Sequence, residues 1–361
     1  METIPNWKRA KTDPDLRRRL ALRGRVMAEI RRFFLDRGFL EADTPLLVRY
    51  PGTEPNLDPF RTSVRDASGR EFSAGLITSP EYSLKKLLAG GFGPLFQLSS
   101  CFRNGEPWSG QAGGEGGRHN PEFTMLEWYR PEADYTVLMS DMESLASAVA
   151  TAVLGRDRAV WQGTEIDLSP PWPRMSVAQA FERHAGIDLL AGIDDPDGFR
   201  KAAEDRGIGV REGDSFDDVF FRIFLRDIEP VLGTADGSGA AVKPVILYDY
   251  PRSMAALARL KPADGRLAER FEAYCGGLEL ANAFSELTDA EEQRRRLEAE
   301  REERRRSGRP DLGIDGDFLE AVGMMPEAAG IAFGVDRLIM LLTDSRHIRD
   351  VLFFPVEDLF S

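Results

Sequence analysis

The stretch that decides the fold is residues 102–131, FRNGEPWSGQAGGEGGRHNPEFTMLEWYRP, which predicts two antiparallel strands joined by a long glycine-rich loop. In the outgoing strand, alternation places Phe123, Glu127 and Tyr129 on one face. Arg103 closes the incoming strand, and the intervening loop is too long for a tight hairpin turn. A guanidinium, an aromatic ring, a carboxylate and a phenol therefore converge beside a loop that we expect to fold over a ligand. Such a surface suits a nucleotide and a substrate that carries amines.

Composition limits the classes of protein to consider. The chain has 361 residues, enough for one large domain or two, and its net charge is −13. The N-terminal sequence METIPNWKRAKTD lacks the apolar core of a signal peptide, and no apolar run approaches the length of about 20 residues that spans a bilayer. We therefore expect a cytoplasmic protein without a membrane partner. Cys101 and Cys275 lack the spacing of metal ligands, so we expect two reduced structural thiols.

The charges are unevenly distributed along the chain. Residues 1–40 hold 11 Lys and Arg against 5 Asp and Glu, a balance of +6, and the remainder carries −19. A tRNA-binding protein usually presents a broad basic face that replaces phosphate counter-ions, and this chain offers only a basic N-terminal segment. Transfer RNA is therefore a poor candidate for a partner. A solvated helix surface explains the basic segment more simply than a docking patch for an acidic partner does, although both interpretations stay open.

Hydrophobic periodicity predicts the elements around the quoted stretch. Residues 13–37 repeat apolar side chains at three- and four-residue intervals, as a helix does, and Gly38 ends that helix. FLEADTPLL follows as a short extended segment whose Pro45 belongs at a sheet edge or an interface. The further predicted segments are loops and a short hairpin over 50–75, a helix from Pro80, a helix over 135–153, a proline-rich connection over 161–176, short helices over 176–230, a buried strand over 243–251 and a helix over 289–308 whose alternating charges predict a solvated surface.

Two acids in FEAYCGGLELANAFSEL are candidate metal ligands. Glu279 and Glu286 lie seven residues apart, so a straight strand would put them on opposite faces. Joint binding of one cation requires a bend or bulge near Asn282 and Ala283. Two carboxylates beside a polyphosphate would suit magnesium, whereas the simpler interpretation is two unrelated acids at strand ends.

Phosphate-binding features are found near the C-terminus, in GIAFGVDRLIMLL. Gly334 precedes a helix whose first turn carries Arg337, so the helix dipole and a guanidinium can both act on a phosphate. The chain lacks the Gly-Lys-Ser/Thr ending of a P-loop, and it shows no Ser or Cys nucleophile with a partnered His in a recognisable setting. We therefore expect chemistry that relies on electrostatic stabilisation.

These motifs resemble a known family. FRNGE, RHNPEFTMLEWYRP, GLELANAFSEL and GIAFGVDRLIMLL are similar to the second and third signature motifs of class II aminoacyl-tRNA synthetases of the lysyl type, and FLEADTPLL resembles the first, dimer-forming motif. The resemblance spans about residues 13–356 and implies an α+β catalytic fold with an antiparallel β-sheet flanked by helices. Only about a dozen residues precede the first predicted helix, so we expect no OB anticodon-binding domain. The closer similarity is to the group of catalytic-domain paralogues that ligate lysine or (R)-β-lysine to elongation factor P.

The resemblance implies roles for residues at matching positions. Arg103 would hold the α-phosphate of ATP and the amino acid carboxylate, Arg337 would reach the γ-phosphate, and Phe123 would stack on adenine. The other implied ATP contacts are Asn104, Glu106, His119, Asn120, Glu279, Leu280 and Gly334. The implied Mg2+ ligands are Glu279 and Glu286. The implied contacts to the amino groups of the substrate are Ser79, Pro80, Glu81, Glu127, Tyr129 and Glu286.

The sequence departs from the family pattern at a few positions. The usual motif is Arg-x-Glu, but here Gly105 precedes Glu106, so either Glu106 takes over the adenine contact or that contact is lost. The loop also carries an insertion over 107–117. Ala332 stands where lysyl-tRNA synthetases have glycine and the paralogue group has alanine, which favours a pocket for (R)-β-lysine and leaves α-lysine open.

The implied activity is that of an AMP-forming amino acid ligase. (R)-β-lysine or lysine would be activated by ATP as an aminoacyl-adenylate and passed to a lysine side chain of elongation factor P. The alternatives are a tRNA-charging catalytic domain, a catalytically silent regulatory paralogue and a synthetase that releases a small amide. We expect a homodimer of one catalytic domain over 1–361, organised as a dimer-forming motif at 13–49, the second motif at 95–131, a mostly helical insertion at 131–240, and an ATP site built from 270–287 and 328–345.

Overall fold

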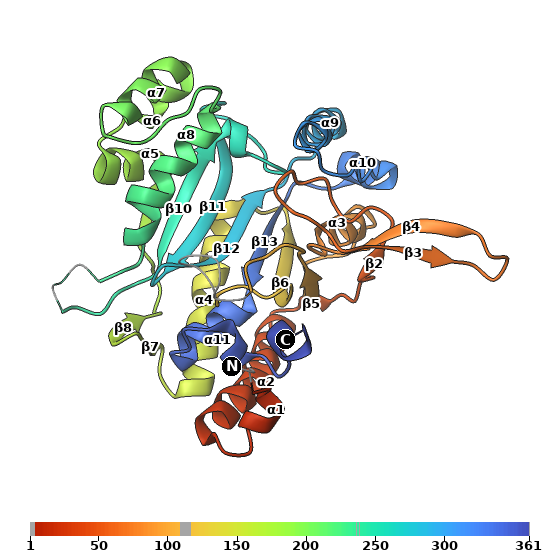
Figure 1. Ribbon diagram of the computed structural model, residues 1–361, viewed down its shortest axis with the longest axis vertical. Coiled ribbons are helices and arrows are strands. Elements are labelled where there is room, and N and C mark those ends of the chain that lie inside the picture. The colour runs from red at the N-terminus through yellow and green to blue at the C-terminus, as the bar shows by residue number, and fades with distance from the viewer. Residues whose placement is uncertain (1–3, 109–116, 236, 238, 361) are drawn as a thin grey trace.

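The centre of the molecule is one eight-stranded sheet (Figure 1). The computed structural model describes residues 4–108, 117–235, 237 and 239–360. Across the sheet the strands are, in order, β1 (Leu40–Glu41), β5 (Leu95–Phe102), β6 (Glu122–Pro131), β13 (Ala328–Gly334), β12 (Leu278–Ser285), β11 (Leu267–Cys275), β10 (Val245–Pro251) and β9 (Arg174–Ser176). The edge strands β1 and β9 run parallel to their neighbours, and the other pairs are antiparallel. The predicted sheet is thereby confirmed.

Three helices pack against one face of this sheet and form the main core. They are α2 (Pro14–Leu35), α4 (Tyr135–Leu154) and α11 (Val335–Thr343). The ring of Phe34 lies 4.8 Å from that of Phe96 and 5.1 Å from that of Trp128, between ring centroids. Both partners come from the faces of β5 and β6 that point away from Glu127. One face of the sheet is therefore covered, and the opposite face is available for a site.

Helix α2 begins and ends where its sequence predicts. The Asp13 side chain accepts a hydrogen bond from the Leu16 amide at 2.9 Å, and Pro14 occupies the first helical position, where a missing N–H costs nothing. Gly38 adopts a φ of 76°, a left-handed conformation that glycine reaches without strain, and the chain then turns into β1. The helix predicted over 13–37 is confirmed, and so is the edge position of the segment after it.

The two strands predicted around the glycine-rich loop are confirmed as β5 and β6. Their register pairs Gln97 with Glu127 and Cys101 with Phe123, which places these four side chains on one face. The predicted loop over the ligand falls partly on residues 109–116, which lie outside the described residues. Cys101 and Cys275 are both buried and unpaired, as predicted.

The segment predicted as a proline-rich connection contains a further hairpin. Strands β7 (Arg158–Trp161) and β8 (Thr164–Asp167) pair around a two-residue turn, and β9 then joins the main sheet. The turn residues Gln162 and Gly163 have φ values of 51° and 83°, as a tight hairpin turn requires. The prediction of a plain connection was wrong because four-residue strands give too short an alternation to detect. Trp161 fixes the hairpin by donating a hydrogen bond to the Gly276 carbonyl at 3.1 Å.

The hairpin of β11 and β12 contains a bulge, as the seven-residue spacing of Glu279 and Glu286 predicts. The bulge lies at another position than predicted. The register pairs Tyr274 with Glu279 but Ala273 with Ala281, so Leu280 is the extra residue. Between Ala281 and Phe284 the ladder is regular, so the bulge predicted near residues 282 and 283 was placed too late. The shift at Leu280 turns the side chain of Glu279 to the face on which the site lies.

The helices within 131–240 belong to two different cores. Helix α4 packs in the main core, and by length and composition it is the one described helix that could cross a membrane, with 50% of its apolar window buried in the fold. A separate hydrophobic cluster lies under the short helices at the far end of the sheet. These are α5 (Val177–Ala180), α6 (Leu189–Asp194), α7 (Pro196–Glu204) and α8 (Phe216–Ile223), with the π-helical turns Phe181–Ala185 and Phe224–Ile228 and the 3-10 turn Glu229–Val231. The short helices predicted over 176–230 are confirmed.

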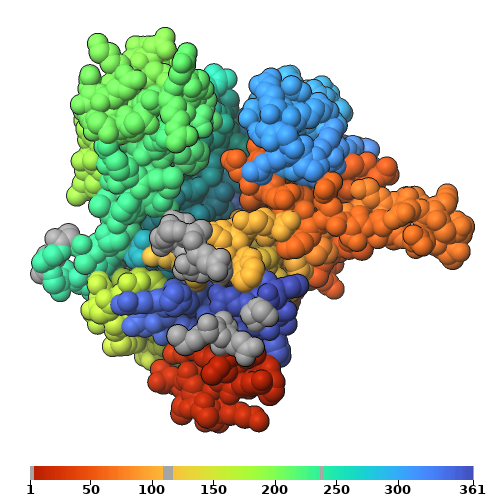
Figure 2. All heavy atoms as spheres, in the orientation of Figure 1, coloured from red at the N-terminus to blue at the C-terminus, as the bar shows by residue number. Residues whose placement is uncertain are grey.

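Two further groups of elements flank the open face of the sheet. Helices α3 (Glu81–Ala89), α9 (Ala290–Arg306) and α10 (Gly316–Met324) lie together at one end (Figure 1). Strands β2 (Leu47–Val48), β3 (Arg61–Arg65) and β4 (Glu71–Leu76) form a small sheet whose β3–β4 hairpin projects from the body. Figure 2 shows that hairpin at one side, and a hollow between α9 and the insertion helices with strands of the main sheet at its floor.

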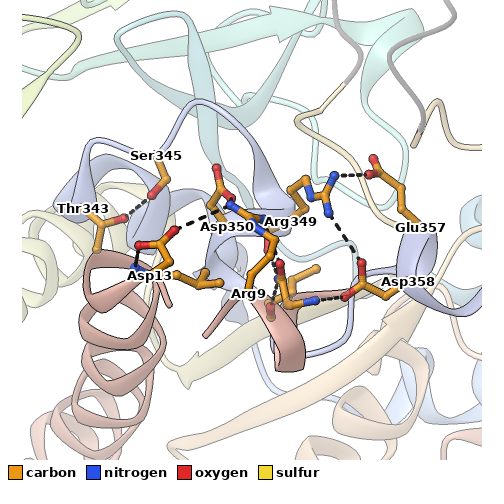
Figure 3. A network of polar contacts seen from close by, with 11 residues as sticks. Arg9, Asp13, Thr343, Ser345, Arg349, Asp350, Glu357 and Asp358 are labelled. Carbon is orange, nitrogen blue, oxygen red and sulfur yellow. Dashed lines mark hydrogen bonds and ion pairs between the residues drawn. The ribbon is translucent and has the colours of Figure 1, made fainter. Parts of the chain in front are cut away.

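The two ends of the chain are joined by a network of polar contacts (Figure 3). It links α1 (Asn6–Arg9) to the 3-10 turn Ile348–Val351 and to α12 (Val356–Phe360). Arg9 pairs with Asp350 at 3.1 Å, and Arg349 pairs with Glu357 at 2.9 Å. The network reaches the site because the Val356 amide, at the start of α12, donates to the Asn120 side chain at 3.0 Å.

Candidate active site

Two adjoining cavities lie on the open face of the central sheet. The first is lined from β6, β12, α11 and the ends of the long loop, by Arg103, Glu106, Arg118, His119, Asn120, Phe123, Thr124, Met125, Glu279, Leu280, Ala281, Asn282, Ala332, Gly334, Asp336, Arg337 and Ile348. The second is lined by Glu54, Leu57, Ser79, Glu81, Tyr82, Arg103, Met125, Glu127, Tyr129, Ala256, Leu257, Asn282, Phe284, Glu300, Gly330, Ile331 and Ala332. Arg103 and Ala332 belong to both walls and therefore mark the junction between the cavities.

The first cavity combines the guanidinium groups of Arg103, Arg118 and Arg337 with an aromatic ring. The Arg103 guanidinium carbon lies 5.1 Å from the centroid of the Phe123 ring. Arg337, in the first turn of α11, donates to the Glu279 carbonyl at 2.7 Å and faces the Glu279 carboxylate at 3.4 Å. These three cations, a helix N-terminus and a π surface form a cavity that suits a polyphosphate carrying a heteroaromatic base.

Glu106 and His119 face one another at the mouth of the first cavity. His119 Nδ1 lies 2.8 Å from Glu106 Oε2, and this hydrogen bond lowers the pKa of the Glu106 carboxyl. The structure thus brings Glu106 into the cavity wall despite the extra Gly105. Asn104 is exposed and outside both linings, and its backbone amide donates to the Asp58 carbonyl at 2.7 Å.

Asn120, Leu280 and Gly334 complete the wall of the first cavity. The Asn120 amide nitrogen donates to the Glu122 carbonyl at 2.5 Å, and its oxygen accepts from Val356, so this side chain braces the wall. A Cβ placed on Gly334 would lie 3.6 Å from its nearest neighbours in the chain. That spacing is ordinary contact, so the protein alone does not demand glycine there.

Glu279 meets another carboxylate on the neighbouring strand. Glu279 stands opposite Tyr274, and Glu272 shares the face of Tyr274, so the two carboxylates face the same side. Burial, followed by the nearby Glu272, raises the pKa of the Glu279 carboxyl. Glu286 lies at the far end of β12, about six strand steps or roughly 20 Å along the backbone from Glu279. The structure therefore places Glu279 near Glu272, whose oxygens accept from Tyr250, Arg270 and Tyr274, and it does not bring Glu286 to Glu279.

The second cavity is centred on a buried carboxylate. Glu127 is 1% exposed, and it accepts hydrogen bonds from Ser79 Oγ at 2.5 Å and from the Tyr129 hydroxyl at 2.9 Å. Burial, reinforced by the charge of Glu81, raises the pKa of Glu127 to about 8. The three predicted residues meet as expected from the sequence, and they present oxygen atoms that an ammonium group can contact.

The start of α3 supplies the rest of this polar wall. Pro80 precedes the helix, and the Glu81 amide donates to Ser79 Oγ at 3.0 Å. Lys85 Nζ lies 2.5 Å from an oxygen of Glu81 and 2.5 Å from an oxygen of Glu286. Burial raises the pKa of Glu286, and the Lys85 charge opposes that rise. The predicted acids converge, together with a cation that the sequence interpretation left out.

Sequence reasoning missed four charged residues of the site. Lys85 could have been found, because it lies one helical turn after Glu81 on the same face. Glu272 could have been found by locating the bulge correctly. Glu54 and Glu300 gave no usable signal, since one lies in a loop and the other on α9, whose alternating charges predict a solvated helix. Burial followed by the charge of Glu300 raises the pKa of Glu54 to about 7.

A buried ion pair ties the site to helix α2. Arg23 forms a short ion pair with Asp336, the residue before Arg337, and donates to Thr124 Oγ1 at 2.6 Å. The Thr124 amide in turn donates to Asp336 at 2.7 Å. The strand that carries Phe123 and the helix that carries Arg337 are thus fixed to one another and to the segment resembling the dimer-forming motif.

Comparison with known proteins gives consistent matches over nearly the whole chain. Residues 7–358 match the family described as tRNA synthetases class II (D, K and N). The elongation factor P–(R)-β-lysine ligases of Erwinia tasmaniensis and Salmonella paratyphi B are each 39% identical to this chain over 362 aligned residues. Those alignments cover 99% of this chain and 99% of each relative.

Proposed function

Because this chain belongs to the class II tRNA synthetase family, we propose that it is an ATP-dependent, AMP-forming ligase that attaches a lysine-type amino acid to elongation factor P. The observation that carries the proposal is the pair of joined cavities. One combines guanidinium groups with an aromatic ring, the other combines carboxylates with a phenol, and Arg103 stands at their junction. The names of the similar ligases supply the acceptor and the class of amino acid.

In the first step the amino acid carboxylate attacks the α-phosphorus of ATP. A carboxylate is already ionised at neutral pH, so no general base is needed. Arg103 would contact both the carboxylate and the α-phosphate, Arg337 would hold the γ-phosphate, and Phe123 would stack on adenine. A P–O bond to the carboxylate forms while the bond between the α- and β-phosphates breaks, and pyrophosphate leaves. The arginines act by stabilising charge that develops on phosphate oxygens.

In the second step an amine replaces AMP. The ε-amino group of a lysine of elongation factor P attacks the activated carbonyl, an amide bond forms, and AMP leaves with the former carboxylate oxygen. The attacking amine loses its proton before or during this step. Around the amino acid, Ser79, Glu81 and Glu127 would hold the ammonium groups, with Tyr129 and Glu286 completing the shell. Because Pro80 only begins α3, we assign it a backbone role.

The first cavity suits a magnesium ion bound together with the ATP phosphates. Glu279 lines this cavity and offers carboxylate oxygens, the donor type that Mg2+ prefers, whereas the oxygens of Glu272 already accept from three other side chains, Tyr250, Tyr274 and Arg270. We propose that Glu279, one of the two ligands that the resemblance implies, holds it. When bound, the ion would neutralise charge on the triphosphate. Glu286 is better suited to an ammonium group, because Lys85 already occupies one of its oxygens.

We favour (R)-β-lysine over α-lysine as the substrate. Ala332 lines both cavities at their junction, so its methyl group narrows the space that receives the backbone end of the amino acid. We also propose a cytoplasmic homodimer that forms through 13–49 and does not charge tRNA. Within that segment Leu35, Leu40, Leu46 and Leu47 are each at least 39% exposed.

The test is ATP-dependent mass gain on purified elongation factor P. The protein is incubated with (R)-β-lysine or α-lysine in parallel, with bulk tRNA as the competing acceptor and a reaction without ATP as the control. We expect one lysyl unit on the protein, a preference for the β isomer and no charging of tRNA. Charging of tRNA alone would identify a minimal synthetase instead. Absence of both transfer and amino acid-dependent pyrophosphate exchange would overturn the ligase assignment.

A further inference from the structure

Lys85 places a cation behind the wall of the second cavity, against the Glu81 carboxylate that lines it. Its side chain lies on α3 and is fully buried at 0% exposure, over the rings of Phe284 and Phe318 at 5.2 and 6.0 Å. Its Nζ lies 2.5 Å from both Glu81 and Glu286, so the two carboxylate oxygens are no more than 5.0 Å apart. Neither the charge nor the burial of Lys85 is used by the reaction steps above, and a buried lysine is costly without a reason.

We propose that Lys85 is a positioning residue: its ammonium group acts as an internal counter-ion that holds Glu81 and Glu286 in place and favours the carboxylate form of Glu286, so that both side chains can bind the ammonium groups of the substrate. This inference rests on the proposed function. Two buried carboxylates at this separation repel one another, and without the charge of Lys85 the buried Glu286 carboxyl takes up a proton more readily. A protonated carboxyl attracts a substrate ammonium far less than a carboxylate does.

The two carboxylate oxygens of Glu286 have different surroundings. Lys85 occupies one oxygen of Glu286, whereas the other, Oε1, is buried and has no hydrogen-bond partner among the described residues. A Cβ placed on Gly330 would lie 2.2 Å from that oxygen and 2.2 Å from the Tyr129 ring, and both Gly330 and Tyr129 line the cavity. Lys85 thus fixes the carboxylate by one oxygen and leaves the other for a ligand.

Other charged groups near Lys85 belong to several elements. Glu127 and Tyr129 reach the cavity from β6, Glu54 from the loop after β2, Glu300 from α9 and Arg103 from the end of β5. Burial lowers the pKa of Lys85 and is the largest single effect, but the charges of Glu286 and Glu81 together outweigh it. The pKa of Lys85 is therefore raised, and its side chain stays charged at neutral pH. Since acids outnumber cations around the cavity, loss of Lys85 is expected to protonate carboxyl groups there.

The test compares Lys85→Met with Lys86→Met. Lys86 is the next residue on α3, partly exposed and paired with Asp315 at 2.6 Å, so it controls for loss of a lysine from this helix. Amino acid-dependent pyrophosphate exchange is measured from pH 6 to 9, with separate KM values for the amino acid and for ATP. For Lys85→Met we expect the amino acid KM to rise about tenfold or more at pH 7, with the ATP KM nearly unchanged and a smaller defect at pH 9, where a larger share of Glu286 is ionised.

Chemical rescue separates charge from packing. In Lys85→Ala, propylammonium is expected to restore much of the amino acid affinity, whereas 1-propanol, which fills the same space without charge, is not. Lys85→Arg should retain more amino acid affinity than Lys85→Met. If Lys85→Met misfolds and loses ATP binding, Lys85→Arg takes its place in the test. Equal rescue by propanol, or an unchanged amino acid KM and pH profile in Lys85→Met, would overturn the inference. Failure of the wild-type protein to show lysine-dependent exchange would instead overturn the proposed function.

Discussion

At the scale of single residues, the most informative position is the junction between the two cavities. Arg103 is the charged residue among the four that line both cavities, so its guanidinium can act on the nucleotide and on the amino acid. We predict that Arg103→Met lowers kcat/KM for pyrophosphate exchange by roughly 10²–10³, the usual effect of removing one group that stabilises developing charge. Circular dichroism should show an unchanged fold. Activity within a few-fold of the wild type would contradict the assigned role.

The raised pKa of Glu127 predicts a pH-dependent stability. An ordinary glutamate ionises near 4.5, and burial raises the pKa of Glu127 in the folded state to about 8. Between these values the folded state holds a proton that the unfolded state has lost. The free energy of unfolding therefore falls by about 1.4 kcal/mol per pH unit as the pH rises through this window.

Replacing Glu127 by an isosteric amide removes this effect. We predict that Glu127→Gln gives a higher Tm than the wild type at pH 8 and a similar Tm at pH 5, while the KM for the amino acid increases. Thermal unfolding without substrate at both pH values measures the difference. A lower Tm for the variant at pH 8 would show that the carboxylate stabilises the fold when ionised.

At the scale of elements, the sequence predicts best those helices and strands whose residue pattern depends on local structure alone. The strands around Phe123 and the helix after Asp13 follow from local alternation and capping. Helix α9 shows the limit, because its charges predict a solvated surface although Arg304 is fully buried and Glu300 lines the site. Which polar side chains turn inward depends on the loop that packs on the helix, and that loop is distant in the sequence.

The buried arginine of α9 positions a loop of the site. Arg304 donates to the carbonyl groups of Glu54 at 2.8 Å and Leu57 at 2.7 Å. We predict that Arg304→Met destabilises the protein by roughly 1–3 kcal/mol, because those carbonyls lose their partner. The KM for the amino acid should rise several-fold, and the KM for ATP should stay close to the wild-type value. The matched control is Arg305→Met on the exposed face of α9, which pairs with Asp311 and should change little.

At the scale of the whole molecule, the motif order predicted the sheet, and strand alternation predicted the face on which Phe123, Glu127 and Tyr129 lie. The charge balance of the site was not predictable in the same way. Lys85, Glu54 and Glu272 come from a helix, a loop and a strand, and only tertiary packing sets which carboxylate lies beside which cation. The positions of Glu279 and Glu286 illustrate this, since one bulge at Leu280 decides which acids share a face.

The proposed dimer predicts that one charged substitution at its interface should dissociate it. Leu47 is 43% exposed on β2, within the segment that resembles the dimer-forming motif. We predict that Leu47→Asp shifts the protein from dimer to monomer in sedimentation velocity, because a buried charge at an interface is costly. Val160→Asp, at an equally exposed position on β7, should leave the dimer intact. A wild-type protein that sediments as a monomer would refute the predicted assembly.

The buried acid beside Ser79, Glu127, also predicts that binding of the amino acid releases a proton to the solution. With a pKa of about 8, Glu127 carries a proton in most free molecules at pH 7. An arriving ammonium group favours the carboxylate, so the proton passes to the buffer. Calorimetric titration in buffers of different ionisation enthalpy should therefore give different heats for the wild type and nearly equal heats for Glu127→Gln. Each loading of amino acid would then slightly acidify its surroundings, and amino acid affinity would follow the proton concentration of the cell.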